Sequence, residues 1–214
     1  MKPPRRPRSS SASVLYFHGF ASSPRSQKVG MLAKLLEPDI VLDAPDCNVP
    51  SFERLDFEAI VRLGLEHARQ RPPAAIVGSS LGALAALEVV RRGVRAPLVL
   101  IAPGLGVGKR WMSRIPPGDP VMMFHHDLNE PAPIHRAFFE KMMSVEPEAQ
   151  APVVPVVIVM GRNDETVPFD LVKSVWDSWD VVPGSQFIEI PEGDHSLVAH
   201  VDVIAKAIRD SVRT

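Results

Sequence analysis

Short apolar runs alternate with longer amphipathic stretches along most of the chain. Runs that are rich in Val, Ile and Leu and bounded by turn residues are typical of buried β-strands. The expected strands are residues 14–17, 40–42, 74–78, 97–102, 155–160 and 186–190. The fifth run, PVVIVM, is apolar throughout, which indicates a strand that is covered on both faces of its sheet.

Between the strands, apolar residues recur at the three- and four-residue spacing of an amphipathic helix. In the first such stretch Val29, Leu32 and Leu36 share one face, and Pro38 follows its end. The expected helices are residues 26–37, 52–71, 81–92, 169–179 and 196–212. This alternation predicts an α/β fold, with a compact, mostly parallel sheet of about six strands and helices on both faces.

Residues 105–152 interrupt the alternation between the fourth and fifth strands. The segment is too long for a plain crossover and is rich in Met, Phe and Pro, so we predict a small helical lid inserted into the domain. Its apolar side chains either pack on the rest of the domain or line an acyl pocket, because lids commonly supply pocket walls. In the second case the expected substrate-binding residues are Trp111, Met122 and Phe138.

The composition is that of an ordinary globular chain. The 214 residues are 45% hydrophobic and 23% charged, and the net charge of −1 gives no overall attraction to nucleic acid or to an anionic membrane. No apolar run approaches the length of a membrane span. Residues 1–12 are basic and proline-rich, which predicts a disordered tail, with a nucleic-acid or targeting role as the weaker alternative. Residues 13–214 are expected to form a single domain.

The only cysteine, Cys47, cannot form an intramolecular disulfide, which agrees with a reducing compartment. The tail also lacks the apolar stretch of a secretory signal, so we expect a cytoplasmic protein. Nothing near Cys47 indicates an activated thiol. The sequence leaves the oligomeric state open.

The first sequence motif with chemical meaning is Gly78-Ser79-Ser80-Leu81-Gly82, which joins a strand to a helix. A serine on such a sharp turn presents its hydroxyl clear of the sheet, and small residues two positions away let the strand and helix approach. Only Ser80 has glycine on both sides at that distance, so Ser80 is the expected nucleophile and Ser79 the alternative. An ordinary glycine-rich turn would be the non-functional explanation.

His18-Gly19-Phe20-Ala21 follows the first strand. In this architecture the corresponding loop supplies one donor of an oxyanion hole, and the start of the helix after the nucleophile supplies the other. We therefore expect the backbone N–H groups of Phe20 and Leu81 to bind a developing oxyanion. His18 itself is expected to be a buried structural residue.

Two further strands are followed by residues that would complete a catalytic triad. Asp164 lies in the turn after the fifth strand, with Glu165 as the alternative carboxylate, and His195 lies on a glycine-hinged loop after the sixth. Asp194 adjoins His195, but we expect it to cap the following helix. The chain order Ser80, Asp164, His195 is the order of the α/β-hydrolase fold.

A metal site is the weaker interpretation of a second group of polar residues in the lid. His125, His126, Asp127 and His135 lie close in sequence, but no helical H-x-x-x-H or H-E-x-x-H pair is present. We expect a polar lid face and no metal or organic cofactor.

Taken together, the HGFASSPRS stretch at residues 18–26, the GSSLG motif, GRNDETVP at residues 161–168 and GDHSL at residues 193–197 resemble the small bacterial α/β-hydrolase esterases of the YqiA type. The resemblance extends from about residue 13 to the end of the chain. It implies a triad of Ser80, Asp164 and His195, with oxyanion donors at Phe20 and Leu81.

The expected activity is therefore that of a serine esterase, which cleaves a small-molecule carboxylic ester through an acyl-enzyme intermediate. Three alternatives remain at this point. The same triad serves thioesterases and other acyl hydrolases, the fold is used by non-catalytic binding proteins, and some members are cofactor-free haloperoxidases. Neither nucleic acid nor a membrane is an expected partner.

Overall fold

A computed structural model of the protein describes residues 11–213. Six parallel strands form one sheet in the order β2-β1-β3-β4-β7-β8. The strands are β1 (Ala12–Phe17), β2 (Ile40–Asp43), β3 (Ala75–Ser79), β4 (Leu98–Ile101), β7 (Val156–Gly161) and β8 (Gln186–Ile190). All six expected strands are confirmed. Of the predicted tail, residues 1–10 lie outside the described residues, and Ala12 already belongs to β1.

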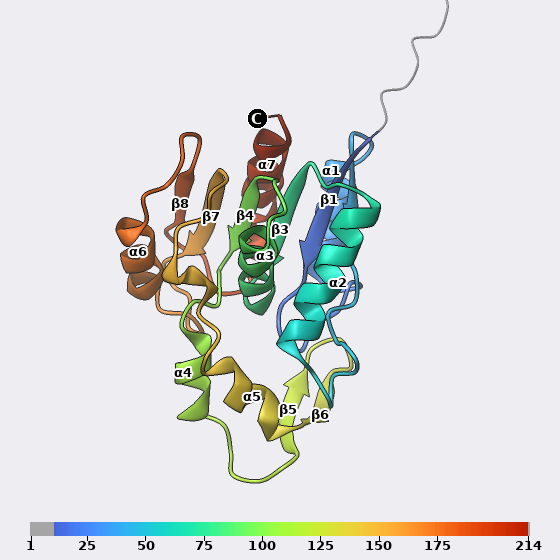
Figure 1. Ribbon diagram of the computed structural model, residues 1–214, viewed down its shortest axis with the longest axis vertical. Coiled ribbons are helices and arrows are strands. Elements are labelled where there is room, and N and C mark those ends of the chain that lie inside the picture. Colours follow the sequence, from blue (N-terminus) through green and yellow to red (C-terminus); the bar gives the residue numbers. More distant parts are fainter. Residues whose placement is uncertain (1–10, 214) are drawn as a thin grey trace, which may run out of the picture.

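Helices cover both faces of the sheet, as predicted (Figure 1). On one face α2 (Phe57–Gln70) and α3 (Leu81–Arg91) pack together over β1, β3 and β4, and on the other α1 (Gln27–Leu36) packs against α7 (Val201–Val212). The helix α6 (Phe169–Ser178) packs along β8, where Phe169 and Phe187 meet edge to face. The four inner strands, β1, β3, β4 and β7, are thus buried between two helical layers, whereas the edge strands β2 and β8 keep exposed residues.

Two helices begin later than their apolar spacing predicts. Asp56 is the N-cap of α2, and its carboxylate accepts a hydrogen bond from the Ala59 N–H at 2.8 Å, so residues 52–55 stay outside the helix. The short 3₁₀ helix η2 (Val198–His200) precedes α7, and Leu197 has a left-handed backbone with φ 49°. The predictions of helix from residues 52 and 196 are therefore wrong by about a turn, because the Asp56 cap sets the start of α2 and the left-handed backbone at Leu197 with the 3₁₀ turn delays α7.

The inserted segment forms a separate layer below the carboxyl ends of the strands in Figure 1, but it is not wholly helical. It contains α4 (Val107–Met112), a hairpin of β5 (Val121–His125) and β6 (Glu130–Ile134), α5 (Arg136–Met142) and the 3₁₀ helix η1 (Pro147–Ala149). The small lid predicted as helical is therefore helical only in part, because it also contains this hairpin. Along β5 the side chains alternate, with Val121 and His125 buried and Met122 and Phe124 exposed, which is the period of a strand.

The strand order reverses direction between β1 and β3. The chain moves from β1 outward to β2 on one side, and from β3 outward to β4 on the other. The carboxyl ends of β1 and β3 therefore form a topological switch point, which is where open α/β sheets bind their ligands. Both the loop after β1 and the turn after β3 are located there.

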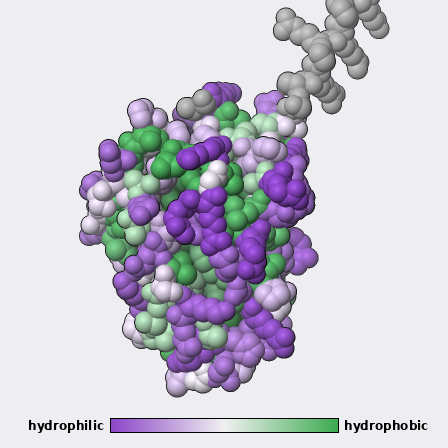
Figure 2. Space-filling model, viewed as in Figure 1, coloured by the Kyte–Doolittle hydropathy of each residue, from purple (hydrophilic) through white to green (hydrophobic). Residues whose placement is uncertain are grey.

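The molecular surface in the same view is largely hydrophilic, with apolar residues visible between the polar ones (Figure 2). The large apolar side chains that are exposed include Met122, Phe124 and Leu128 on the hairpin. Within residues 11–213, none of the helices combines the length and the apolar character needed to cross a bilayer.

Candidate functional site

The turn after β3 holds Ser80 in a strained backbone conformation. Its φ of 53° and ψ of −117° are rarely adopted by residues with a side chain, and its N–H is fixed by a 2.9 Å hydrogen bond to the Ile101 carbonyl. A Cβ atom at Gly78 would lie 2.4 Å from the Gly82 carbonyl oxygen, and one at Gly82 would lie 2.2 Å from the Phe17 carbonyl oxygen. Both glycines are therefore required for the close packing of this turn.

The structure brings Ser80, His195 and Asp164 together. Nε2 of His195 lies 3.0 Å from Oγ of Ser80, and Nδ1 of His195 lies 2.8 Å from Oδ2 of Asp164. If Nδ1 carries the ring proton and donates a hydrogen bond to Asp164, Nε2 is free to accept the proton of the Ser80 hydroxyl. This arrangement can activate the serine hydroxyl as a nucleophile.

Asp164 rather than Glu165 makes the contact with the imidazole ring. The Asp164 side chain is fully buried, and its second oxygen, Oδ1, accepts hydrogen bonds from the N–H groups of Thr166 and Val167 at 2.8 and 2.7 Å. Glu165 is exposed, and its nearest approach to His195 is 3.5 Å to the backbone nitrogen. The buried, doubly hydrogen-bonded carboxylate is the one suited to orient a ring.

The turn that carries Asp164 and the loop that carries His195 are held together through their backbones. A Cβ atom at Gly161 would lie 2.3 Å from the Gly193 carbonyl oxygen, and that oxygen accepts the Asn163 N–H at 2.9 Å. Sequence reasoning treated Gly193 only as a hinge and did not single out Gly161. Their positions in the sequence could have indicated this role, since each glycine comes at or shortly after the end of a strand and a few residues before a predicted functional residue.

Ser79, the alternative nucleophile, is turned away from this group. It is buried, and its hydroxyl accepts a hydrogen bond from Nζ of Lys28 at 2.9 Å. Lys28 belongs to α1, on the face of the sheet opposite α3, and successive side chains of a strand point to opposite faces. Ser80, the residue after Ser79, is only partly buried.

The two predicted oxyanion donors belong to segments next to Ser80. Leu81 is the first residue of α3, where an N–H has no intrahelical acceptor, and within the described part of the chain neither its N–H nor that of Phe20 is paired. A Cβ atom at Gly19 would lie 3.4 Å from Cβ of Ser80, so the loop after β1 lies against the serine. The two N–H groups therefore remain available for a substrate oxygen.

His18 has the structural role that the sequence predicts. It is buried, its Nδ1 lies 2.9 Å from the Gly19 carbonyl oxygen, and its Nε2 accepts the Cys47 N–H at 2.8 Å. Burial raises the pKa of the Cys47 thiol to about 12, which keeps it protonated and inert. One ring nitrogen of His18 thus contacts its own loop, and the other joins that loop to the one that carries Cys47.

Aromatic rings surround the side chain of Phe20. The Trp111 ring lies 5.0 Å from it between centroids, and the Phe138 ring stacks on it at 5.9 Å. Phe52 and Phe139 complete the cluster at 5.6 and 6.0 Å. Of the three expected substrate-binding residues, Trp111 and Phe138 therefore lie against Phe20 on the loop after β1, whereas Met122 is 54% exposed on the hairpin and is not part of the cluster.

The lid is fastened to both sides of the site. On α4, the Arg110 guanidinium donates to the Thr166 carbonyl at 2.8 Å, and from the hairpin the His126 N–H donates to the Ala21 carbonyl at 2.8 Å. An ion pair of Arg25 and Asp127 at 2.9 Å adds a further link. The lid is therefore linked to the turn that carries Asp164 and to the loop after β1.

The polar residues of the lid have separate partners. His125 is buried and its Nδ1 accepts the Leu128 N–H at 3.3 Å, whereas His135 pairs with Asp119. Burial lowers the pKa of His125. Among residues 11–213, no group of three or more His, Cys, Asp or Glu side chains could hold a metal ion.

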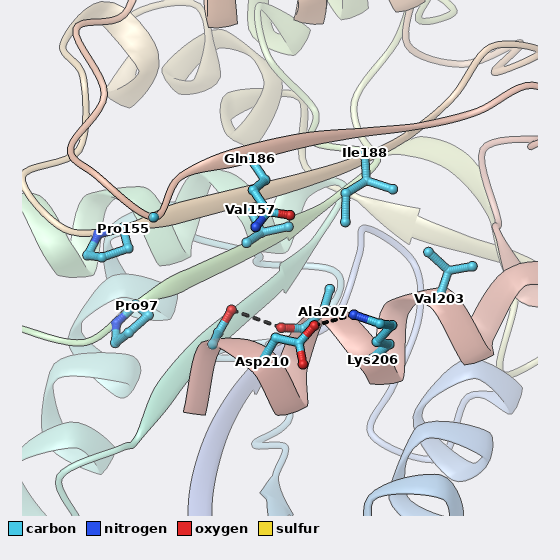
Figure 3. Close-up of a pocket in the computed structure, with 11 residues that line it drawn as sticks. Pro97, Pro155, Val157, Gln186, Ile188, Val203, Lys206, Ala207 and Asp210 are labelled. Carbon is cyan, nitrogen blue, oxygen red and sulfur yellow. Dashed lines mark hydrogen bonds and ion pairs between the residues drawn. The ribbon is translucent and has the colours of Figure 1, made fainter. Parts of the chain in front are cut away.

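A small cavity lies at the opposite end of the sheet (Figure 3). Its volume is about 90 Å³, and it is lined by Pro97 and Pro155, which precede β4 and β7, and by residues of α7. In Figure 3 Lys206 and Asp210 of α7 pair with each other along its edge. Parallel sheets bind ligands at the carboxyl ends of their strands, so this cavity is not part of the candidate site.

Comparisons with known proteins agree with this fold. The sequence profile of an uncharacterised protein family, UPF0227, matches residues 13–208. Est1E from Butyrivibrio proteoclasticus, solved with bound ferulic acid, is 14% identical with a TM-score of 0.74, and the match covers 95% of this chain and 90% of that one. The esterase domain of a Rhodothermus marinus protein is 18% identical, with a TM-score of 0.71 and coverage of 96% and 90%. Mouse alpha/beta hydrolase domain-containing protein 10 is 18% identical, with a TM-score of 0.70 and coverage of 94% and 89%. No curated protein matches the sequence.

Proposed function

Because the chain belongs to the uncharacterised protein family UPF0227 and has the α/β-hydrolase fold, we propose that it is a serine hydrolase that cleaves carboxylic esters. The observation that carries the proposal is the hydrogen-bonded series of Ser80, His195 and Asp164, with distances of 3.0 and 2.8 Å. The strained turn at Ser80 supports it, because such strain is typical of functional residues.

The proposed reaction has two steps. Oγ of Ser80 attacks the ester carbonyl carbon while Nε2 of His195 takes the hydroxyl proton, and the alcohol then leaves with that proton. Water next attacks the acyl-enzyme, gives a proton to His195, and the acid is released as Ser80 is reprotonated. Asp164 holds the imidazole in the productive tautomer and stabilises the imidazolium.

The negative charge that develops on the carbonyl oxygen needs hydrogen-bond donors. The N–H groups of Phe20 and Leu81 are proposed to supply them, since both are unpaired within the described residues, Leu81 follows Ser80, and the loop of Phe20 lies against Ser80 at Gly19. Each such donor typically lowers the barrier by about 3 kcal/mol. No step of this reaction requires a metal or an organic cofactor.

The substrate is proposed to be a small-molecule ester with an apolar acyl group. The aromatic cluster around Phe20 supports this, because Trp111 and Phe138 bring apolar rings against the residue that carries one of the proposed oxyanion donors. Est1E, which has the same fold, was solved with ferulic acid, an aromatic acid. A series of p-nitrophenyl esters of increasing chain length, compared with acyl-CoA thioesters, measures the preferred acyl group and separates esterase from thioesterase activity.

The identity of the nucleophile is tested by fluorophosphonate labelling and by Ser80→Ala. We expect label on Ser80 alone, and a loss of kcat of about five to six orders of magnitude in the variant, because the serine cannot be replaced as the attacking group. Circular dichroism and the thermal midpoint of the variant control for folding. Label on Ser79, or turnover that survives in the folded variant, would contradict the proposal.

A further inference from the structure

A lysine of α1 lies against the back of the Ser80 turn. Nζ of Lys28 donates a 2.9 Å hydrogen bond to the hydroxyl of Ser79, which is the residue bonded directly to Ser80. The phenol of Tyr16, on β1, interacts with the same hydroxyl. Ser79 and Tyr16 are both buried, so this polar group lies in the layer between the sheet and α1.

Two carboxylates act on the Lys28 ammonium, and both belong to segments that carry the proposed triad. One is Asp164, and the other is Asp194, the residue before His195. The Asp194 carboxylate caps its own loop, accepting the Leu197 N–H at 2.7 Å and the Ser196 hydroxyl at 2.9 Å. Although burial alone would raise it, the pKa of Asp194 is lowered by these hydrogen bonds and by the charge of Lys28.

The helix α7 packs against α1, but among the described residues none of its charged side chains forms an ion pair with Lys28. Lys206 and Asp210 pair with each other, and the Arg209 guanidinium donates to the Leu35 carbonyl near the far end of α1. Asp202 is exposed. Among the described residues, the charged groups that act on Lys28 are therefore those of Asp164 and Asp194.

We propose that Lys28 is a positioning residue for the proposed Ser80–His195 pair, holding the end of the nucleophile strand through its hydrogen bond to Ser79 while its charge attracts Asp194 on the histidine loop. The proposal rests on the serine hydrolase function proposed above. Lys28 touches neither the substrate nor the reacting atoms, so its effect is on the geometry and charge of the groups that do.

The position of Lys28 is unfavourable for a residue with only a structural role. Burial lowers the pKa of its amine to about 8, although the charges of Asp194 and Asp164 act in the opposite direction. The charged lysine therefore reduces the stability of the folded state at neutral pH, and an apolar residue of similar size is often better tolerated at such a site. Strongly shifted titrating groups next to a site are candidates for a functional role.

The test compares Lys28→Met, which keeps the length of the side chain without its charge, with Lys28→Arg, which stays charged at every working pH. The readouts are the second-order rate of fluorophosphonate labelling at Ser80, from about pH 6 to about pH 10, and the thermal midpoint. Lys34→Met, on the exposed face of the same helix, is the matched control. It should change neither readout.

We expect Lys28→Met to slow labelling about 10-fold at neutral pH, because small misplacements of reacting groups slow reactions strongly. Its thermal midpoint should stay level or rise. Wild-type labelling should decline above about pH 8, as the ammonium loses its proton, and Lys28→Arg should label at close to the wild-type rate at neutral pH and remove that decline.

The outcomes separate this proposal from the one on which it rests. If the wild-type protein is not labelled at Ser80, the serine hydrolase function is wrong and the role of Lys28 falls with it. If the wild-type protein is labelled and Lys28→Met reacts equally fast at every pH, only the role of Lys28 is wrong. A lower thermal midpoint together with slow labelling that Lys28→Arg does not restore would indicate a structural role alone and would also overturn the proposal.

Discussion

Replacing Gly82 by alanine tests how tightly the Ser80 turn depends on the contact between α3 and β1. The added Cβ atom would lie 2.2 Å from the Phe17 carbonyl oxygen and 2.7 Å from that of His18. Both atoms belong to the backbone of β1 and its loop, so no flexible side chain can move aside. Since a carbon and a carbonyl oxygen in contact are about 3.3 Å apart, α3 must withdraw by about 1 Å.

The expected cost has two parts. Overpacking of this kind typically destabilises a protein by about 1 to 3 kcal/mol, and the upper part of that range applies because two backbone segments must separate. A shift of about 1 Å at the nucleophile can reduce the rate about 100-fold. Gly82→Ala should therefore lower both the free energy of unfolding, measured in urea, and kcat/KM for a p-nitrophenyl ester.

Gly30→Ala is the matched control. Gly30 lies on the exposed side of α1, and no atom lies within 4 Å of the position that its Cβ would take. Alanine should stabilise the helix there by about 0.5 to 1 kcal/mol, because glycine has more freedom to lose on folding. If Gly82→Ala matched the wild type in stability and rate, the close approach of α3 and β1 would not be what forms the turn.

Further substitutions test the charges of the site and of the fold. Asp164→Asn should lower kcat about 10⁴-fold by favouring the wrong tautomer of His195, whereas Glu165→Gln should leave kcat within about a factor of three; steady-state kinetics measures both, and the reverse order would reassign the acid. Hydrogen bonds from Arg91 and then from Arg92 lower the pKa of Glu88 although burial acts to raise it, so Glu88 stabilises the fold above its ordinary pKa and loses this effect as the pH falls through its lowered one. Glu88→Gln should therefore cost about 1 to 3 kcal/mol at neutral pH and much less near pH 3, as measured by urea unfolding at each pH. The lowered pKa of Lys28 means that its charged form destabilises the fold, and between about pH 8 and about pH 10 the unfolded chain binds more protons than the native one. Wild-type stability should gain up to about 3 kcal/mol from this group across that window, and Lys28→Met should lack the gain.

Much of the fold could be predicted because its signals are local. A parallel strand that is buried on both faces is apolar almost throughout, as residues 155–160 are, and this pattern is visible without any knowledge of its neighbours. The six strands and the alternation with helices followed directly. The start of α2 did not, because the Asp56 cap competes with an apolar pattern that continues through residues 52–55.

The lid is the part of the chain whose secondary structure the local sequence pattern does not predict. Residues 105–152 carry apolar side chains at spacings that a helix or a strand could use, and prolines at positions 131 and 133 argue against a central strand. The segment nevertheless forms a hairpin, because β6 is paired only with β5 and its prolines need not donate to a further strand. Only its packing against the rest of the domain selects between these two structures.

The sequence by itself determined the class of fold and the three strand ends at which Ser80, Asp164 and His195 lie, because apolar periodicity and turn residues act over a few neighbouring positions. The tertiary structure decided which of two adjacent carboxylates reaches the imidazole, which glycines hold the loops in contact, and where the ammonium of Lys28 lies. Those relations join residues that are far apart in the chain. They depend on burial and on distances of a few ångström, which no local pattern records.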